Sequence, residues 1–254
     1  MHPISAVIIT RNEERIIGSC LETVQQVADE IIIVDSYSTD RTIEISKTFG
    51  AKIFLQQWPG FGPQKNFGVQ VASHNYILGL DADEILTDEA IREIKKLKET
   101  GLKGVYEFSR LNFYFGKFLR YGMESPDYKK RLFDKRQVQW NNNQLHEDLI
   151  VADGYPVIRL KGHIKHYSYY SIAHYIEKAN YYTTIAAEEL EKKGKKNNYA
   201  KFLFSPGFVF IKSYFLKRGF LDGMHGFIIA LFNARTNFLK YAKLWELVRN
   251  NKKG

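Results

Sequence analysis

The sequence is poor in residues that cross-link a chain or carry it through a membrane. It has 254 residues but only one cysteine, so Cys20 has no partner for an internal disulfide, which fits a reducing cytosol. No stretch reaches the roughly 20 uninterrupted apolar residues of a spanning helix, because Pro206 and Lys212 interrupt the best candidate, 202–216. The first residues also lack the features of a secretory signal. We therefore expect a cytoplasmic protein that is at most peripheral to a membrane.

Two common nucleotide-binding motifs are also missing. No G-x-G-x-x-G follows the first predicted strand, which argues against a dinucleotide cofactor. No Walker loop is present, which excludes a P-loop nucleotide triphosphatase. Any nucleotide must therefore be bound by other residues.

Positive charge is plentiful but unevenly placed. From Lys192 to Gly254 the sequence has 14 Lys and Arg against 2 Asp and Glu, a local charge of +12 within a total of +9. A basic tail of this kind is typical of binding to nucleic acid, of binding to an anionic membrane, or of a solvated helix face.

The first hundred residues alternate between short apolar runs and helical patterns. Strands are predicted at 5–10, 30–35, 51–55 and 75–81, and helices at 13–27, 39–50, 64–72 and 88–100. Such alternation predicts βαβ units, and hence an α/β fold with a mostly parallel sheet. After Gly101 the pattern becomes aromatic and strand-like at 104–119 and 128–140, and a long helix is predicted at 171–194. We accordingly divide the chain into residues 1–100, residues 101–170 and a helical extension (171–254).

Polar residues follow three of the predicted strands. Ligands of open parallel sheets bind where the carboxyl ends of the strands meet the following loops. These positions are Thr10, Asn12 and Glu13 after the first strand, Asp35 after the second, and Asp81 and Asp83 after the fourth. Each cluster could instead contain a helix N-cap, with Asn12, Ser38, Thr39 or Thr87 in that role. Capping alone does not require acids at these strand ends.

The sequence Asp81-Ala82-Asp83 suggests a metal site. Two carboxylates on the same side of an extended chain suit Mg²⁺ or Mn²⁺, which often share their coordination shell with phosphates. We expect Asp83 to be the direct ligand and Asp81 to contact a ribose or reach the metal through water. Glu84 is expected to point elsewhere. The competing interpretation is a solvated turn.

A nucleoside diphosphate joined to such a metal needs further contacts. Asn12, Glu13 and Asp35 could line a pocket for the base and ribose. Lys65 and Asn66, near the start of the third predicted helix, could hold phosphate or ribose.

Four motifs in order, "VIITRNEE", "IIIVDSYSTDRT", "PQKNFG" and "LDADE", resemble the nucleotide-sugar half of inverting family 2 glycosyltransferases with the GT-A fold. The segments "LHEDLIVADGYPVIRLKGHIKHYSYYS" and "GFLDGMHGFIIALF" resemble the branch containing lipopolysaccharide-core β-1,4-glucosyltransferases. The resemblance implies transfer of a hexose, with glucose expected, from a UDP-sugar to a glycolipid such as lipopolysaccharide core. It also implies that residues 1–100 are the half that binds the nucleotide sugar, that residues 101–170 are the half that binds the acceptor, and that Asp35 contacts the uracil. The family often has two acids here, whereas this chain has Asp35-Ser36.

An inverting transfer requires a carboxylate that accepts the proton of the acceptor hydroxyl. The cluster His146-Glu147-Asp148 provides one, and the resemblance favours Glu147, with Asp148 as the alternative. A solvated acidic pair is the non-catalytic interpretation. By the same resemblance His166 is a candidate third metal ligand, although His163 and His166 are a weak zinc signal by themselves.

The tail contains one apolar helical face. Its residues recur at spacings of three and four: Phe227, Leu231, Ala234, Phe238, Tyr241, Trp245 and Val248. The accompanying cations predict binding to an anionic leaflet at the cytoplasmic face, although such a helix could equally cover its own domain. No nucleic-acid motif accompanies the charge, so no nucleic-acid partner is expected.

Two other functions remain open at this point. A nucleotidyltransferase could use a similar Asp-x-Asp site. A non-catalytic membrane scaffold could retain the fold, although the intact acids argue against decay.

Overall fold

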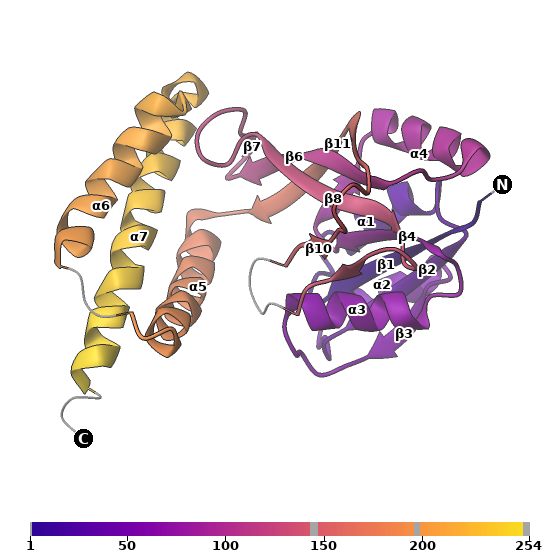
Figure 1. Cartoon of the computed structure of the whole chain (residues 1–254), viewed down its shortest axis with the longest axis horizontal. Coiled ribbons are helices and arrows are strands. Elements are labelled where there is room, and N and C mark those ends of the chain that lie inside the picture. Colours follow the sequence, from indigo (N-terminus) through magenta and orange to yellow (C-terminus); the bar gives the residue numbers. More distant parts are fainter. Residues whose placement is uncertain (1, 143–146, 196–198, 251–254) are drawn as a thin grey trace. The chain divides into compact units, whose positions relative to one another are not determined.

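The computed structural model describes residues 2–142, 147–195 and 199–250 (Figure 1). The chain forms two compact units. The first contains Met1–Arg110 and Asp127–His166, and the second contains Leu111–Pro126 and Tyr167–Gly254. This division differs from the predicted ranges 1–100, 101–170 and 171–254, because the middle range is shared between the units. Two long strands, β6 (Val105–Tyr114) and β11 (Val157–Tyr169), each begin in the first unit and end in the second.

The first unit begins with alternating strands and helices. They are β1 (Ile4–Thr10), α1 (Ile17–Val24), β2 (Glu30–Asp35), α2 (Thr42–Thr48), β3 (Lys52–Leu55), α3 (Phe61–Val71), β4 (Tyr76–Asp81), β5 (Glu84–Leu86) and α4 (Asp88–Thr100). Between β6 and β11, the strands of the first unit are β8 (Asp127–Asp134), β9 (Gln139–Trp140) and β10 (Leu149–Ile150). The predicted α/β fold class is confirmed.

The main sheet has the strand order β3-β2-β1-β4-β8-β6-β11-β5. Strands β3, β2, β1 and β4 are parallel, whereas β8 pairs antiparallel with both β4 and β6 (Figure 1). In a parallel array all carboxyl ends meet at one edge, so the polar residues that follow β1, β2 and β4 are brought together.

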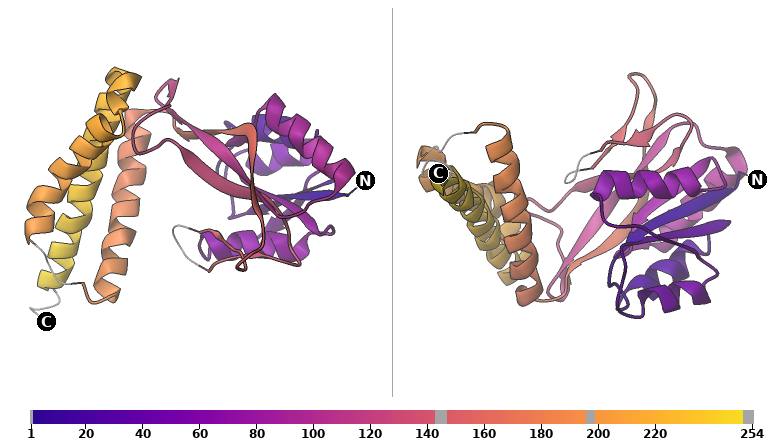
Figure 2. Two further views of the ribbon diagram at one scale, coloured as in Figure 1. Left: turned by 45° about the horizontal axis from the view of Figure 1, so that its top comes forward. Right: turned by 90° about the horizontal axis from the view of Figure 1, so that it is seen from below.

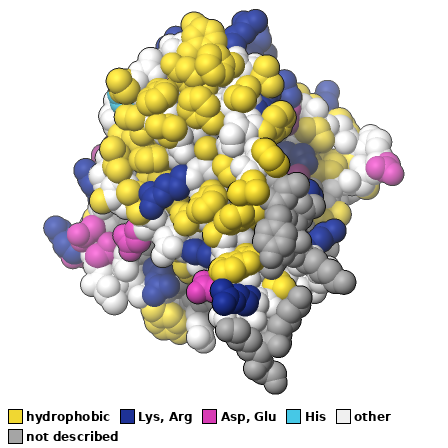
Figure 3. All heavy atoms as spheres, turned by 90° about the vertical axis from the view of Figure 1, so that its left-hand side faces the viewer, with side chains coloured by type: hydrophobic (Ala, Val, Ile, Leu, Met, Phe, Trp, Pro, Cys, Tyr) yellow, Lys and Arg dark blue, Asp and Glu magenta, His cyan; other side chains and the backbone are white. Residues whose placement is uncertain are grey.

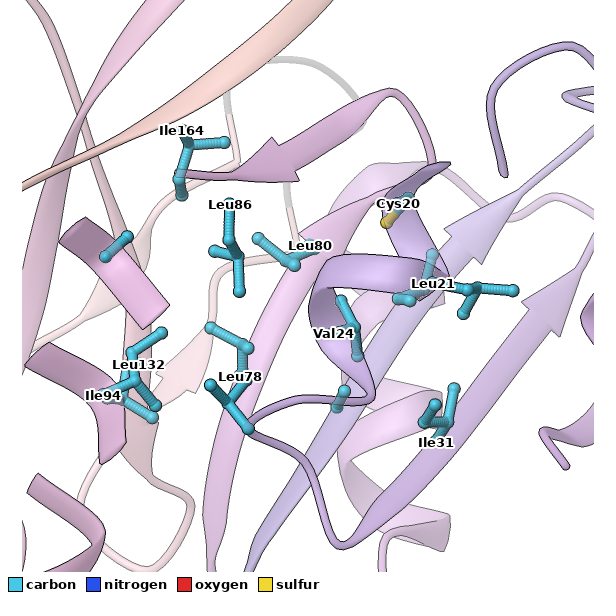
Figure 4. Close-up of a cluster of buried hydrophobic side chains, with 14 of the residues drawn as sticks. Cys20, Leu21, Val24, Ile31, Leu78, Leu80, Leu86, Ile94, Leu132 and Ile164 are labelled. Atoms are coloured by element: carbon cyan, nitrogen blue, oxygen red, sulfur yellow. The ribbon is translucent and has the colours of Figure 1, made fainter. Parts of the chain in front are cut away.

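Alternate residues of the central strands are buried on opposite faces of the sheet. One core contains Ile8 of β1 and Leu80 of β4 and is covered by α1 and α4, as the close-up of Cys20, Leu21, Val24 and Ile94 shows (Figure 4). The other core contains Val7 and Val34 and is covered by α3 and Trp140. Because the strands are buried on both faces, they are continuous apolar runs in the sequence.

Helix α3 lies unusually close to the sheet. A Cβ atom on Gly68 would come within 2.3 Å of Val7 Cγ1 and 3.0 Å of Val34 Cγ2. Only glycine fits at this distance, which explains the glycine of "PQKNFG". The close approach brings the side chains of the first half of α3 to the carboxyl ends of β1 and β4.

Three helix starts differ from the prediction by three residues or more, one of them being α2, which begins at Thr42 and not at residue 39. Helix α1 begins at Ile17 and not at residue 13, and the backbone N–H groups of Asn12 and Glu13 donate to Ser38 and to Thr42, the first residue of α2. Helix α3 begins at Phe61, before the predicted residue 64. Pro63 lies in its first turn, where a missing N–H leaves no helical hydrogen bond unmade.

The second unit is mainly helical. It contains α5 (Ile172–Lys192), α6 (Tyr199–Ile211), the π-helical turn η1 (Lys212–Leu216), the 3₁₀ turn η2 (Gly219–Asp222) and α7 (Met224–Asn250), with the short strand β7 (Lys117–Phe118) paired to β6. Helix α7 packs against both α5 and α6 (Figure 2). Across the described residues, no helix combines the length and apolar content that crossing a bilayer requires.

Candidate functional site

Register places three of the predicted residues side by side at the carboxyl edge of the parallel strands. Thr10 pairs with Asp35 across β1 and β2, and Ile9, the residue before Thr10, pairs with Asp81 across β1 and β4. Thr10 and Asp35 are buried, and the Asp81 side chain is 20% exposed. The sheet therefore gathers these side chains, as the sequence predicted.

Two loops at this edge are held together by their own polar groups. The Asn12 N–H donates to Ser38 Oγ, and Asn12 Oδ1 accepts from the Thr39 N–H. Asp35 accepts hydrogen bonds from both the N–H and the hydroxyl of Ser38, and the Glu13 N–H donates to Thr42 Oγ1. Neither α1 nor α2 has a side-chain N-cap, so the capping interpretation of Asn12, Ser38 and Thr39 is wrong, whereas Thr87 does cap α4.

These bonds also give Asp35 and Asn12 a structural task. The Asp35 side chain is enclosed and both of its carboxylate oxygens accept from Ser38. Contact with a uracil base, the role that the resemblance implies for Asp35, would have to compete with these bonds and stays a prediction.

Asp81 lies between two cations. Lys65 Nζ is 2.9 Å from Asp81 Oδ1, and an Arg131 Nη2 group donates to Asp81 Oδ2 at 2.9 Å. Burial by itself disfavours the charged form, but Lys65 and Arg131 hold the pKa of Asp81 well below its usual range. Asp81 is therefore ionised, and both of its oxygens face positive charge.

Arg131 belongs to a buried ion network that the sequence patterns did not reveal. It is 2% exposed and donates to both oxygens of Glu84, which is itself fully buried. Arg110 also donates to Glu84 and pairs with Asp127. Glu84 in turn accepts from the Asp81 N–H. Glu84 therefore points into the core and not, like Asp81 and Asp83, toward the partly exposed edge, and it supports the turn at Asp81 through the Asp81 N–H and Arg131.

One signal for Arg131 was present in the sequence. Arg131 lies next to Leu132 and Phe133 within a predicted strand, so its charged side chain is expected to be buried with them. Such a residue requires buried acids as partners. Its partners lie about 50 residues earlier in the chain, and pattern reading does not reach across that separation.

Asp83 and His166 lie together. His166 Nε2 is 3.4 Å from Asp83 Oδ2, because His166 pairs with Glu84 across β11 and β5. Both side chains are partly exposed, at 17% and 14%. The Asp83 carboxylate suits Mg²⁺ or Mn²⁺, whereas an imidazole is a less usual ligand of these ions. Within the described residues no group of three or more His, Cys, Asp or Glu converges on one point.

The two candidate bases differ in their surroundings. Glu147 is 16% exposed in its side chain, and its Oε1 accepts from Lys65 Nζ at 2.7 Å. Asp148 is 60% exposed and pairs with Lys130 at 2.9 Å. His146, the first member of the predicted cluster, lies outside the described residues. Of the two acids, only Glu147 joins the group around Asp81.

Asn66 has a different role from the predicted ligand contact. Its Nδ2 donates to the Trp140 carbonyl at 2.9 Å, and its Oδ1 accepts from the Trp140 N–H at 3.1 Å. Trp140 begins the loop that carries Glu147, since it pairs with Leu149 across β9 and β10. Both ends of the Asn66 amide are thus committed to holding this loop.

Several buried polar atoms at the same edge have no hydrogen-bond partner among the described residues. They are Thr10 Oγ1, Gln64 Oε1 and Trp140 Nε1. Buried polar groups are normally paired, so unpaired ones beside a charged cluster favour a ligand-binding site.

Comparison with known proteins identifies the family. The family model described as glycosyl transferase family 2 matches residues 5–159, which include all the groups described above except His166. The chain belongs to glycosyltransferase family 2 and is a glycosyltransferase.

Similar proteins extend beyond the family model. An uncharacterized glycosyltransferase of Rickettsia typhi is 33% identical over 97% of this chain and 88% of its own length. The lipopolysaccharide core biosynthesis glycosyltransferase LpsC of Rhizobium meliloti is 29% identical over 96% of this chain and 92% of its own length. The crystal structure of S. aureus TarS 1-349 in complex with UDP covers 98% of this chain and 92% of that chain, with a TM-score of 0.47 and 15% identity.

Proposed function

We propose that this glycosyltransferase moves a hexose, with glucose expected, from a UDP-sugar to a hydroxyl of a glycolipid such as lipopolysaccharide core, with inversion at the anomeric carbon. The similarity to LpsC supports the acceptor class. Membership of the glycosyltransferase family sets aside the nucleotidyltransferase and scaffold alternatives. The observation that carries the proposal is the arrangement of Glu147, Lys65 and Asp81 beside the Asp83–His166 pair.

The proposed reaction is a single displacement. The acceptor hydroxyl oxygen bonds to the anomeric carbon while the bond from that carbon to the diphosphate oxygen breaks. Glu147 accepts the hydroxyl proton, a contribution that is typically worth about 10²–10⁴-fold in rate. Asp83 and His166 would hold a Mg²⁺ or Mn²⁺ ion, which when bound offsets negative charge on the diphosphate. Thr10, Asn12, Glu13 and Asp35 stay our candidates for base and ribose contacts.

Isothermal titration of the full chain with UDP and a panel of UDP-sugars, with and without Mn²⁺, tests the donor proposal. We expect binding that depends on the metal, since two protein side chains form only part of a shell. Other nucleotides serve as the matched comparison. A protein that binds no nucleotide in any condition would exclude a UDP-sugar donor.

We also propose that the second unit binds an anionic membrane at the cytoplasmic face. Large apolar side chains are exposed along α6, η1 and the start of α7, including Leu203 at 66%, Phe204 at 74%, Leu216 at 67% and Met224 at 68%. Figure 3 shows hydrophobic side chains gathered on the face that carries α6 and α7, with Lys and Arg among and around them. An apolar surface with neighbouring cations is the chemistry of an interfacial helix.

The apolar face that the sequence predicted on α7 is only partly covered. Phe227, Leu231, Phe238 and Trp245 are each 37–45% exposed, whereas Ile229, Ala230 and Leu244 are the residues that face the helical core. The helix therefore covers its own unit with one side and leaves part of the predicted face in contact with solvent. Helix α7 can therefore cover its own unit with one side and contact a membrane with the other, which supports the membrane proposal.

Sedimentation with liposomes tests the membrane proposal. We expect the protein to bind anionic vesicles at low salt, to bind neutral ones weakly, and to dissociate in part at high salt, because each nearby Lys or Arg adds about 1 kcal/mol. Replacing Lys212, Lys217 and Arg218 by glutamine should weaken the anionic preference. Lys95→Gln with Lys96→Gln, on exposed positions of α4, is the control. If wild-type protein ignores anionic vesicles at low salt, the proposal is wrong.

A further inference from the structure

We propose that Lys65 is a positioning residue that fixes the general base Glu147. Nothing in the family comparison assigns this role, and the sequence alone suggested a phosphate or ribose contact for Lys65. The inference rests on the proposed function, since it takes Glu147 as the base.

The contacts of the Lys65 ammonium carry the inference. Its Nζ lies 2.7 Å from Glu147 Oε1 and 2.9 Å from Asp81 Oδ1, and the side chain is 2% exposed. It also lies 4.7 Å from the centre of the Trp140 ring. The ammonium donates a hydrogen bond to Glu147 Oε1 and lies within ion-pair distance of Asp81 Oδ1. An enclosed cation beside two carboxylates holds these carboxylates in place.

The neighbouring charges form an alternating chain. Glu84 pairs with Arg131, Arg131 with Asp81, Asp81 with Lys65, and Lys65 with Glu147. Each charge is flanked by the opposite sign, and Glu84, Arg131 and Lys65 are almost completely enclosed. Interactions between enclosed charges are screened little by water. This series of ion pairs therefore fixes the position of Glu147, the carboxylate at its end, relative to the core.

The same helix holds the loop of Glu147 at a second point. Asn66, the next residue of α3, binds both the N–H and the carbonyl of Trp140, and the Asn141 N–H donates to the Asp148 carbonyl. Two adjacent residues of α3 thus fix the start of the loop and its acid. Because α3 lies directly on the sheet at Gly68, this anchor is rigid.

A fixed Glu147 has a chemical consequence. Lys65 bonds Oε1, which orients Oε2 as the atom that accepts the hydroxyl proton. Positioning of a reacting group within a few tenths of an ångström is a large part of its catalytic value. Asp81 lies on the other side of the same ammonium and helps to fix its position.

A double-mutant cycle tests the coupling. Lys65→Met, Glu147→Gln and the double variant are compared for kcat with a UDP-sugar donor and for UDP affinity in the presence of Mn²⁺. We expect Lys65→Met to lower kcat by about 10- to 100-fold, a fraction of the effect of a base. In the Glu147→Gln background, Lys65→Met should lower kcat by less than about threefold, because the effects of residues that act as a unit are not additive. UDP affinity should change less than about threefold.

Three further variants complete the design. Lys65→Arg keeps a cation and should recover much of the lost kcat, and it serves in place of Lys65→Met if the methionine variant melts at a much lower temperature. Asp81→Asn removes the charge of the second acid beside Lys65 and should also lower kcat. Lys130→Met removes the matched Lys–acid pair at Asp148 and should leave kcat nearly unchanged.

The outcomes are separable. Equal losses from Lys65→Met in both backgrounds, or a UDP affinity that falls tenfold or more while kcat is kept, would show that Lys65 binds the donor and would overturn the inference. A Lys65→Met variant that keeps the kcat of the wild type would also overturn the inference. A fully active Glu147→Gln protein would reject the proposed base itself, and the inference with it.

Discussion

Replacing Glu147 by glutamine is expected to lower turnover by about 10²- to 10⁴-fold, which is the usual contribution of a general base. Glutamine has nearly the same shape but does not take up a proton at neutral pH. The oxygen of its amide can still accept the Lys65 hydrogen bond, so the loop is expected to remain in place. Initial rates with saturating donor, together with UDP binding by titration, measure the effect; binding should be nearly unchanged.

The comparison variant is Asp148→Asn. Asp148 is 60% exposed and is paired with Lys130 at the surface, so its amide should retain most of the activity. The opposite ranking, with Glu147→Gln fully active and Asp148→Asn inactive, would transfer the role of base to Asp148. Equal and small losses would exclude both acids.

Replacing Asp83 by asparagine or alanine is expected to abolish metal-dependent turnover without unfolding the protein. Asp83 is partly exposed and lies outside the buried Glu84–Arg131 network, so its loss should cost little stability. Activity over a range of Mn²⁺ concentrations and Mn²⁺-dependent UDP binding are the measurements, with a thermal melt to establish folding. Asp88→Asn, at an exposed position of α4, is the control.

His166 provides a graded test of the same site. If it completes the partial shell with Asp83, His166→Ala should raise the Mn²⁺ concentration needed for half-maximal activity by about tenfold or more, in keeping with the loss of a group at a metal site. An Asp83→Ala protein that stays active in the presence of a chelator would contradict the metal assignment. An unchanged metal requirement in His166→Ala would remove the histidine from the shell.

Much of the fold followed from local patterns. Strands buried on both faces are continuous apolar runs, so the positions of β1, β2 and β4 could be predicted closely. The helix starts were harder to predict: α1 begins at Ile17 and not at residue 13, and the N–H groups of Asn12 and Glu13 have partners 26 and 29 positions later in the chain. Parallel topology also allowed Thr10, Asp35 and Asp81 to be grouped before any coordinates, since carboxyl ends of parallel strands share an edge.

The roles within that group could not be predicted in the same way. Asn66 looked like a ligand contact, but its amide is directed to the backbone of Trp140, 74 positions later. Arg131 was not singled out at all, although it holds both Asp81 and Glu84. Side-chain partners at such separations depend on how α3, β8 and the β9–β10 loop pack, which no local pattern encodes.

By itself, the sequence determined the α/β class, the edge of the sheet that carries the polar residues, the acids Asp81, Asp83 and Glu147 as candidates, and the resemblance to glycosyltransferase family 2. Only the tertiary structure showed that Glu147 and Asp148 differ in exposure and in their lysine partners. It also placed His166 beside Asp83, and Lys65 between Asp81 and Glu147. The physical reason is that periodicity and strand order follow from interactions between near neighbours, which the sequence states directly. Burial and charge pairing depend on which distant segments enclose a side chain, and these are settled only when the chain has folded.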